Sequence, residues 1–264
     1  MQIENLRISL VQTDITWEEI DRNLERLNSL ILFNISDSDL IVLPEFFTTG
    51  FTLNPCEYAE KMDDKTIKWM RSIVAEKQSA IMGTTIIKEE NNVYNRMIFI
   101  NKDGNLSYFD KRHLYRIGGE GRFLSPGKTR LIATIREWRI FPLICYDLRF
   151  PVWSRYKGDY DILIYAANWP DTKIDIWKTL LKARAIENQA YVIGVNRIGT
   201  DGQNENYSGN SSVYGPQGQI VAEFESDKER IETFTLSMKE LRDFRKSFPV
   251  HLDADDFKIC ADIE

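Results

Sequence analysis

The segment Arg139–Trp153, RIFPLICYDLRFPVW, places a cysteine at the end of an apolar run. Such a run predicts a buried strand, and Cys145 follows at its carboxyl end, succeeded by Tyr146, Asp147 and Arg149. Free cysteine is among the most buried residue types and often serves as a small hydrophobic side chain, so this pattern by itself favours a structural role. A catalytic role requires a neighbour that lowers the pKa of the thiol or takes its proton, because the thiolate is the nucleophile.

The composition is that of an acidic chain with enough apolar residues for a substantial core. Of 264 residues, 43% are hydrophobic, and this size predicts a single α/β domain over residues 1–264. Acidic residues outnumber basic ones by 40 to 34, which gives a net charge of -6, and no basic run interleaved with aromatic residues stands out. The sequence therefore predicts no nucleic-acid partner.

The remaining global features predict a soluble, cytoplasmic protein without a membrane segment. The first residues, MQIENLRISLVQTD, lack the basic and apolar regions of a signal peptide, and no apolar run approaches the ~18 residues of a membrane span. Cys56, Cys145 and Cys260 are far apart, which is typical of a reducing compartment rather than of a disulfide framework. With only His113 and His251 besides, local spacing offers no metal site.

Strand and helix patterns alternate along the chain. Helical periodicity covers 17–33, 65–77, 152–158 and 177–190, with a further helix near the C-terminus. Strand patterns cover 6–12, 39–44, 80–89, 93–100, 105–110, 138–145, 160–168, 191–199 and 230–236, and a hairpin is predicted over 211–224. Because hairpins interrupt the βα alternation, we expect mixed sheets covered by helices.

Several predicted strands are followed by a polar or reactive side chain: Glu45, Lys111, Cys145 and Asn168. In open α/β sheets ligands bind beyond the carboxyl ends of the strands, so neighbouring parallel strands would bring these residues to one rim. We therefore expect a shared pocket, with Asn168 and the adjoining Trp169 as substrate-binding walls.

Each residue also has an ordinary structural interpretation. Glu45 is flanked by a proline and two phenylalanines, and a carboxyl group in an apolar surround would have the raised pKa that a general acid and base needs. Lys111 belongs to the polar run DKRH and, taken alone, is typical of an exposed lysine. His113 is interpreted as a hydrogen-bonded structural group rather than as the base. Cys56 and Cys260 are interpreted as structural, because no such cluster surrounds them.

Charged residues close to these positions are expected to hold the site in shape. Asp147 and Arg149 would orient the turn after the cysteine through an ion pair or backbone hydrogen bonds. Arg184 falls on or beside the apolar face of its predicted helix and therefore needs a carboxylate such as Glu187. An internal ion pair or a subunit contact is the interpretation we favour for Arg184.

Three longer motifs make the chain resemble the nitrilase superfamily of carbon-nitrogen hydrolases. LIVLPEFF around Glu45 is similar to the family's glutamate motif, YFDKRHLY around Lys111 to its lysine motif, and LICYDLRFP around Cys145 to its cysteine motif, in the family's order and approximate spacing. The resemblance runs from LRISLVQTD to FPVHLDADDF. It implies a catalytic triad of Glu45, Lys111 and Cys145. It also implies a fourth site residue, Glu120, which lies six residues before the proline of FLSPG.

Further strings, KRHLYR, CYDLRFPVWSR, YAANWP and ARAIENQAYV, look like the ω-amidase group of this superfamily. The resemblance implies an α-β-β-α sandwich, a homodimer or higher homo-oligomer formed through the sheet-covering helices, and no cofactor or metal. The implied reaction is hydrolysis of the terminal amide of a small 2-oxo dicarboxylic acid monoamide, such as 2-oxoglutaramate or 2-oxosuccinamate, with water as the second reactant.

These residues support a specific hypothesis of mechanism. Glu45 takes the proton of Cys145, and the thiolate attacks the amide carbon to give a thioester. Lys111 and the backbone N–H of Tyr146 stabilise the oxyanion, and Glu120 holds the lysine or the incoming water.

The identity of the substrate leaves alternatives open. A carboxylate on the substrate needs a cation, and Arg116, Arg155 and Arg197 all lie near predicted pocket segments. The same chemistry also suits an aliphatic amidase, an N-carbamoyl amino acid hydrolase or a nitrilase. A catalytically silent binding module is the alternative from another class. A Schiff base on Lys111 is disfavoured, because it leaves the motif around Cys145 unexplained.

Overall fold

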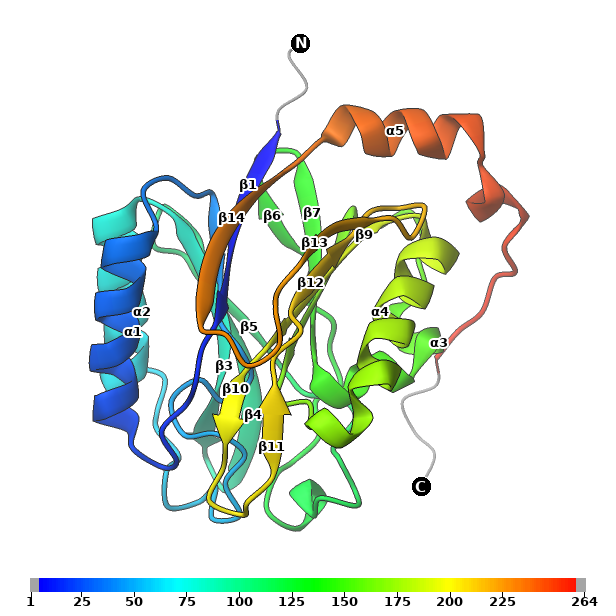
Figure 1. Ribbon diagram of the computed structural model, residues 1–264. Coiled ribbons are helices and arrows are strands. Elements are labelled where there is room, and N and C mark those ends of the chain that lie inside the picture. Colours follow the sequence, from blue (N-terminus) through cyan, green and yellow to red (C-terminus); the bar gives the residue numbers. More distant parts are fainter. Residues whose placement is uncertain (1–4, 260–264) are drawn as a thin grey trace.

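The computed structural model describes residues 5–259, so Cys260 lies outside the described part, and two six-stranded sheets are stacked face to face (Figure 1). The first sheet contains, in spatial order, β14 (Arg230–Leu236), β1 (Leu6–Gln12), β2 (Leu40–Val42), β3 (Ala80–Glu89), β4 (Asn92–Ile100) and β5 (Leu106–Asp110). The second contains β13 (Ile220–Glu223), β12 (Ser212–Tyr214), β9 (Tyr191–Asn196), β8 (Ile162–Ala167), β7 (Trp138–Ile144) and β6 (Ala133–Ile135). A short hairpin, β10 (Ile198–Thr200) and β11 (Asn206–Ser208), extends from one end.

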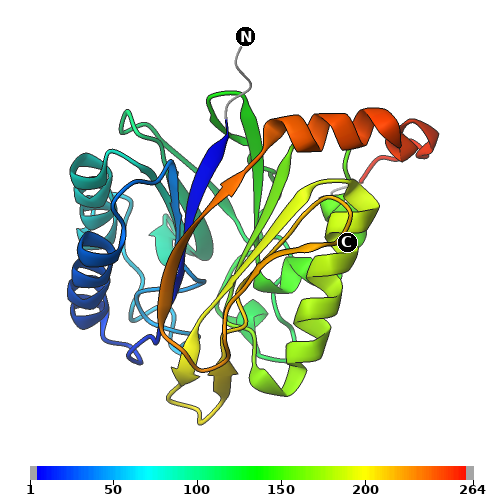
Figure 2. The same cartoon turned by 45° about the horizontal axis from the view of Figure 1, so that its top comes forward.

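Helices cover the two outer faces of this stack, as Figures 1 and 2 show from two directions. The first sheet is covered by α1 (Ile20–Asn34) and α2 (Lys65–Lys77), and the second by α3 (Pro151–Ser154) and α4 (Ile174–Asn188). A fifth helix, α5 (Met238–Ser247), lies across the end of the stack at which β1 begins. The arrangement confirms the predicted α-β-β-α sandwich of two mixed sheets.

The strands are apolar on both faces because each sheet packs against the other sheet and against helices. In β7, Ile140 and Ile144 point into the core between the sheets, whereas Phe141 and Leu143 pack under α4. The same alternation places Ile8 of β1 between the sheets. This two-sided burial explains why these segments read as continuous apolar runs rather than as alternating ones.

The direction of the central strands decides where the site lies. β1, β2 and β3 run parallel in the first sheet, as do β7, β8 and β9 in the second, while antiparallel strands stand at the edges. Residues that follow β2, β7 and β8 therefore leave the stack at its rim, with the two sheets contributing from opposite sides.

Two predicted elements differ from the structure: the strand predicted over 191–199 is divided into β9 and β10, and the helix predicted over 152–158 is shorter. The helical pattern over 152–158 shortens to α3, which ends at Ser154, because Arg155 adopts an extended conformation and Gly158 has a φ of 76°. The backbone N–H of Tyr156 donates instead to the side chain of Asn188 at the end of α4. This hydrogen bond attaches the segment after α3 to the end of α4.

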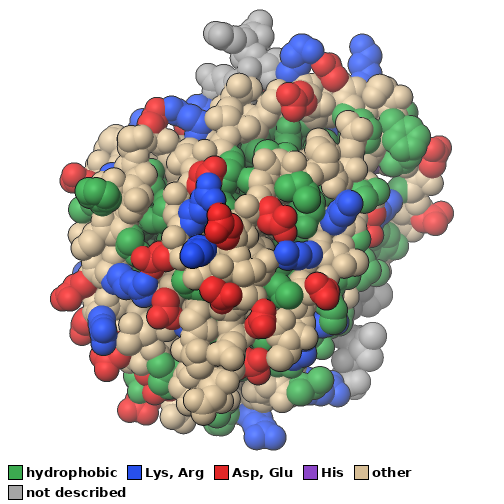
Figure 3. All heavy atoms as spheres, viewed as in Figure 1, with side chains coloured by type: hydrophobic (Ala, Val, Ile, Leu, Met, Phe, Trp, Pro, Cys, Tyr) green, Lys and Arg blue, Asp and Glu red, His purple; other side chains and the backbone are tan. Residues whose placement is uncertain are grey.

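The surface carries charges of both signs. On the face in Figure 3, Lys and Arg side chains alternate with Asp and Glu, and no extended patch of one sign appears there. Within residues 5–259, none of the helices is both long and apolar enough to cross a membrane.

Candidate functional site

Cys145 stands at the point where β7 ends and a 3-10 turn, η2 (Cys145–Arg149), begins. Its φ of 41° lies in the left-handed region, which residues other than glycine adopt only when the surrounding structure holds them there. Its side chain faces a pocket, and its thiol lies 3.8 Å from the backbone oxygen of Asn168, to which it can donate. Cys145 is therefore partly accessible from the pocket and is not a fully buried core residue.

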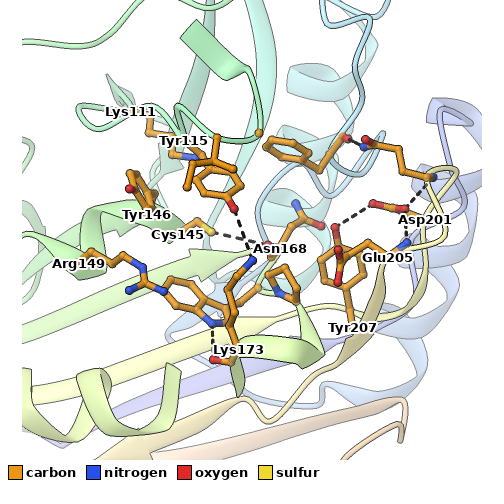
Figure 4. A pocket seen from close by; sticks show the side chains of 16 residues that line it. Lys111, Tyr115, Cys145, Tyr146, Arg149, Asn168, Lys173, Asp201, Glu205 and Tyr207 are labelled. Carbon is orange, nitrogen blue, oxygen red and sulfur yellow. Dashed lines mark hydrogen bonds between the residues drawn. The ribbon is translucent and has the colours of Figure 1, made fainter. Parts of the chain in front are cut away.

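The pocket has a volume of about 520 Å³ and opens at the rim between the two sheets (Figure 4). The residues that line it are Phe51, Lys111, Tyr115, Ile117, Gly118, Cys145, Tyr146, Arg149, Asn168, Trp169, Pro170, Lys173, Asp201, Gln203, Glu205 and Tyr207.

A buried lysine joins two carboxylates beside the cysteine. Lys111 Nζ donates to Glu45 Oε1 at 2.9 Å and to Glu120 Oε1 and Oε2 at 2.9 and 2.8 Å. All three side chains are at most 2% exposed. A buried ammonium in contact with two carboxylates is costly to desolvate unless each charge is compensated, which makes this cluster unusual for a structural ion pair.

Glu45 is surrounded by hydrogen-bond donors. Asn95 Nδ2 donates to Oε1 at 2.8 Å, and the backbone N–H of Asn168 donates to Oε2 at 2.9 Å. The apolar surround expected from its sequence neighbours is therefore wrong, because hydrogen-bond donors contact the carboxylate, and Phe46 and Phe47 belong to two separate hydrophobic clusters.

The charges of this cluster shift several pKa values. Burial by itself would lower the pKa of Lys111, but the negative charges of Glu120 and Glu45 together outweigh burial and raise it. Burial raises the pKa of Glu120, and the lysine only partly opposes this. Burial and the Glu45 charge raise the pKa of the Cys145 thiol well above its ordinary value, against the opposing effect of Lys111. The surroundings of the cluster thus favour the protonated forms of the Cys145 thiol and of Lys111.

The turn that carries the cysteine is held from two sides. Asp147 is fully buried and accepts hydrogen bonds from the backbone N–H of Ile144 at 3.0 Å and of His113 at 3.1 Å. The ring of His113 lies 2.8 Å from the same carboxylate, so His113 is a hydrogen-bonded structural group, as predicted. Arg184 donates to the carbonyl of Leu148 at 2.7 Å from behind.

Arg184 also forms the predicted ion pair with Glu187, at 3.0 Å. Arg149, by contrast, does not pair with Asp147. Its guanidinium lies over the ring of Trp169, 5.2 Å from the centroid, and it lines the pocket. Only the aspartate of that expected pair orients the turn.

Comparison with known proteins places this site in a family. The sequence matches the model described as Carbon-nitrogen hydrolase over residues 7–246. The chain belongs to the carbon-nitrogen hydrolase family. "Omega-amidase YafV" of Escherichia coli (strain K12) is 41% identical to it over 254 residues, 96% of this chain and 98% of that protein. "2-oxoglutaramate amidase" of Bacillus subtilis is 33% identical, over 93% of this chain and 96% of that protein.

Solved structures agree with this assignment. The hydrolase is similar to XC1258 from Xanthomonas campestris, described as a CN-hydrolase superfamily protein with an arsenic adduct in the active site, with a TM-score of 0.94 and 40% identity. The match covers 97% of this chain and all of that one. Nit3 of Saccharomyces cerevisiae, a member of branch 10 of the nitrilase superfamily, has a TM-score of 0.85 and 25% identity over 94% of this chain and 95% of that one.

The hydrolase brings together most of the residues that its sequence singles out. One cluster contains Glu45, Lys111, Glu120 and Cys145. Glu45 and Lys111 follow strands of the first sheet, and Cys145 follows a strand of the second. Asn168 and Trp169 line the pocket, although Asn168 also donates its side-chain N–H to the carbonyl of Glu45 at 2.7 Å.

None of the three arginines considered for binding a substrate carboxylate, Arg116, Arg155 and Arg197, lines the pocket of the hydrolase. Arg116 is exposed, and Arg155 donates to the carbonyl of Glu187 at 2.6 Å. Arg197 is fully buried and pairs with Asp14 at 2.9 Å. The structure gives Arg155 and Arg197 other partners and leaves Arg116 exposed, so it supports none of the three as the cation for the carboxylate.

Sequence reasoning missed two groups of pocket residues. Lys173, at the end of a short 3-10 turn after β8, lies 3.5 Å from the hydroxyl of Tyr115. The β10–β11 hairpin contributes Tyr207, whose hydroxyl donates to Asp201 at 2.9 Å.

Within residues 5–259, no three His, Cys, Asp or Glu side chains are arranged to hold a metal ion.

Proposed function

We propose that this hydrolase releases ammonia from the terminal amide of a small 2-oxo dicarboxylic acid monoamide, through a thioester on Cys145. Membership of the carbon-nitrogen hydrolase family makes it an enzyme, and relatives named omega-amidase support amides as the class of substrate. The observation that carries the mechanism is the contact of Lys111 with Glu45 and Glu120 beside a cysteine at the pocket. 2-Oxoglutaramate and 2-oxosuccinamate are the substrates we favour.

The first half of the reaction needs a base, because the thiol is protonated at rest. Glu45 takes the proton of Cys145 as the sulfur attacks the carbonyl carbon of the amide. The negative charge that develops on the carbonyl oxygen is stabilised by Lys111 and by the N–H of Tyr146, in the first turn of η2, where amide groups lack acceptors within the turn. Glu45 then gives its proton to the nitrogen, the C–N bond breaks, and ammonia leaves.

The second half uses the same groups with water as the nucleophile. Glu45 takes a proton from water, whose oxygen attacks the thioester, and the C–S bond breaks as the sulfur regains a proton. The products are a carboxylic acid and the free thiol. Glu120 does not contact the pocket directly; it holds Lys111 in place with both of its oxygens.

The charge of the pocket supports a substrate with a carboxylate. Lys111 is already compensated by two carboxylates, which leaves Arg149 and Lys173 as the pocket cations within the described residues whose hydrogen-bonding capacity is mostly free. Both side chains line the same pocket as Cys145 (Figure 4). A carboxylate at the far end of a short amide would lie within reach of this pair.

A panel of amides tests the proposal. Ammonia release should be fastest with 2-oxoglutaramate or 2-oxosuccinamate, and at least ~10-fold slower, as kcat/KM, with glutamine, an N-carbamoyl amino acid, a simple nitrile and a neutral aliphatic amide. Faster turnover of any of the last four would replace the proposed substrate by that one. No release from any of them, together with a rate of Cys145 alkylation by iodoacetamide that is the same in Glu45→Gln as in the wild type, would favour the silent binding module.

Replacing Arg149 with methionine should separate charge recognition from chemistry. Methionine keeps an apolar contact with Trp169 but removes the charge, so kcat/KM for 2-oxoglutaramate should fall ~10- to 100-fold, mostly through KM, since a hydrogen bond to a charged group contributes about 1.5–3 kcal/mol. For a neutral amide of the same length kcat/KM should hardly change. Arg116→Met, an exposed arginine outside the pocket, is the matched control. Equal losses for both amides would remove Arg149 from substrate recognition.

We also propose that the enzyme works in the cytoplasm as a homodimer formed through its sheet-covering helices. Two free cysteines, Cys56 and Cys145, support a reducing compartment. Apolar side chains that are 39–57% exposed on α3 and α4, Val152, Ile176 and Ile186, support a covered helical face. Light scattering of the pure protein decides the oligomeric state, and a monomer at micromolar concentration would exclude the dimer.

A further inference from the structure

We propose that Asn95, a fully buried residue in the middle of β4, positions Glu45 for proton transfer, an inference that rests on the proposed role of Glu45 as the base. Asn95 does not line the pocket, so it acts through the glutamate rather than on the substrate. Its side-chain N–H donates to Glu45 Oε1 at 2.8 Å. The orientation of its amide group follows from this contact, because a carboxylate oxygen only accepts.

The same residue also fixes the lysine. The backbone oxygen of Asn95 accepts a hydrogen bond from the backbone N–H of Lys111 at 2.9 Å, at the position where the chain leaves β5. One residue of β4 thus holds the base through its side chain and the cation through its main chain. A change of side chain alone leaves the second contact in place, so the two contributions can be separated by mutation.

The contacts around Glu45 define the plane of its carboxylate. Oε1 accepts from Asn95 and Lys111, both on the first sheet, and Oε2 accepts from the backbone of Asn168 on the second. Without Asn95, Oε1 keeps one donor, on a lysine side chain that also serves Glu120. The carboxylate could then rotate away from the thiol, and a displacement of about 1 Å is enough to cost ~10²-fold in rate. Glu45 needs its place twice in each turnover, first as base and then as acid.

A purely structural role for Asn95 makes a different prediction. Its side-chain oxygen has no hydrogen-bond partner among residues 5–259, so within the described protein the amide group is only half used. A leucine of similar size would fill the same buried strand position and would remove that unpaired oxygen. If Asn95 served folding alone, any loss of kcat in Asn95→Leu would be accompanied by a matching fall in the melting temperature.

The test compares Asn95→Leu with the wild-type enzyme on its best amide substrate. We expect kcat to fall ~10- to 100-fold while KM stays within about threefold, and the melting temperature to change by only a few degrees. Asn188→Leu is the matched control: Asn188 is equally buried and hydrogen-bonded but lies at the end of α4, so stability should fall with little change in kcat. Asn95→Ala replaces the leucine variant if the latter does not fold.

A second readout shows whether the effect passes through Glu45. In a Glu45→Gln background, Asn95→Leu should lower the rate of Cys145 alkylation by iodoacetamide no further, although it lowers that rate in the wild type. Equal effects in both backgrounds, a kcat within threefold of wild type, or a loss that appears as KM, would each overturn the proposal. Because alkylation needs no amide, an enzyme inactive on every amide tested would refute the proposed substrate, while the alkylation rates would still decide the role of Asn95.

Discussion

Cys145→Ala is expected to reduce ammonia release from the amide substrate by ~10⁴-fold or more while leaving the fold intact. The base and the ammonium beside the sulfur have no nucleophile to act on once the sulfur is gone, and catalytic groups that act as a unit fail together. Stability should change little, because the cysteine is partly exposed to the pocket and is held in a left-handed conformation that costs energy. Ammonia assays and thermal unfolding measure the two effects.

The covalent intermediate gives this prediction its control. Mass spectrometry of the wild-type enzyme, quenched during turnover, should show the acyl group on the peptide that contains Cys145 and on no peptide of the alanine variant. Cys56→Ala is the matched variant, since Cys56 is a free and exposed cysteine away from the pocket, and it should keep normal activity. A Cys145→Ala protein that releases ammonia at the normal rate would end the proposed mechanism.

The strand ends are the part of the site that the sequence predicts. An apolar run precedes each of Glu45, Lys111, Cys145 and Asn168. A run that stops at a polar residue indicates the end of a strand, and this holds without knowledge of which strands pair. Their convergence, however, takes place between two sheets, and the strand before the lysine is antiparallel to its neighbour. The sequence therefore predicts that these residues come together, as they do in the structure, but it predicts a simpler topology than the real one.

The residues that the sequence does not predict depend on contacts across the fold. Asn95 is a polar residue inside a strand, a visible irregularity, but only the pairing of β4 with β3 and β5 places it against Glu45. The sequence predicts the wrong environment for Glu45 for the same reason: Phe46 and Phe47 are its neighbours along the chain, but they pack into two separate hydrophobic clusters. Arg149 and Lys173 become pocket cations only once the loops after two different strands are packed together.

Lys111→Met is expected to lower kcat sharply and to make stability depend more strongly on pH. The variant loses the cation that faces the developing oxyanion, and loss of such a group costs ~10²- to 10³-fold in kcat. It also leaves Glu45 and Glu120 buried without their shared ammonium, and breaking a buried ion pair in this way typically costs about 3–5 kcal/mol. Thermal unfolding between pH 5 and pH 8, with ammonia assays at each pH, measures both effects.

The sign of the pH dependence follows from the raised pKa of Glu120. A carboxyl group whose pKa is higher in the folded than in the unfolded protein is favourable to folding while protonated, and stability falls as pH rises through the folded value. Removing Lys111, which opposes that rise, should enlarge the effect, so the variant should lose more stability at pH 8 than at pH 5. Adding Glu120→Gln removes one of the two charges and should restore stability at pH 8 without restoring activity. Equal destabilisation at both pH values, or recovery of activity in the double variant, would contradict a buried ammonium shared by two carboxylates.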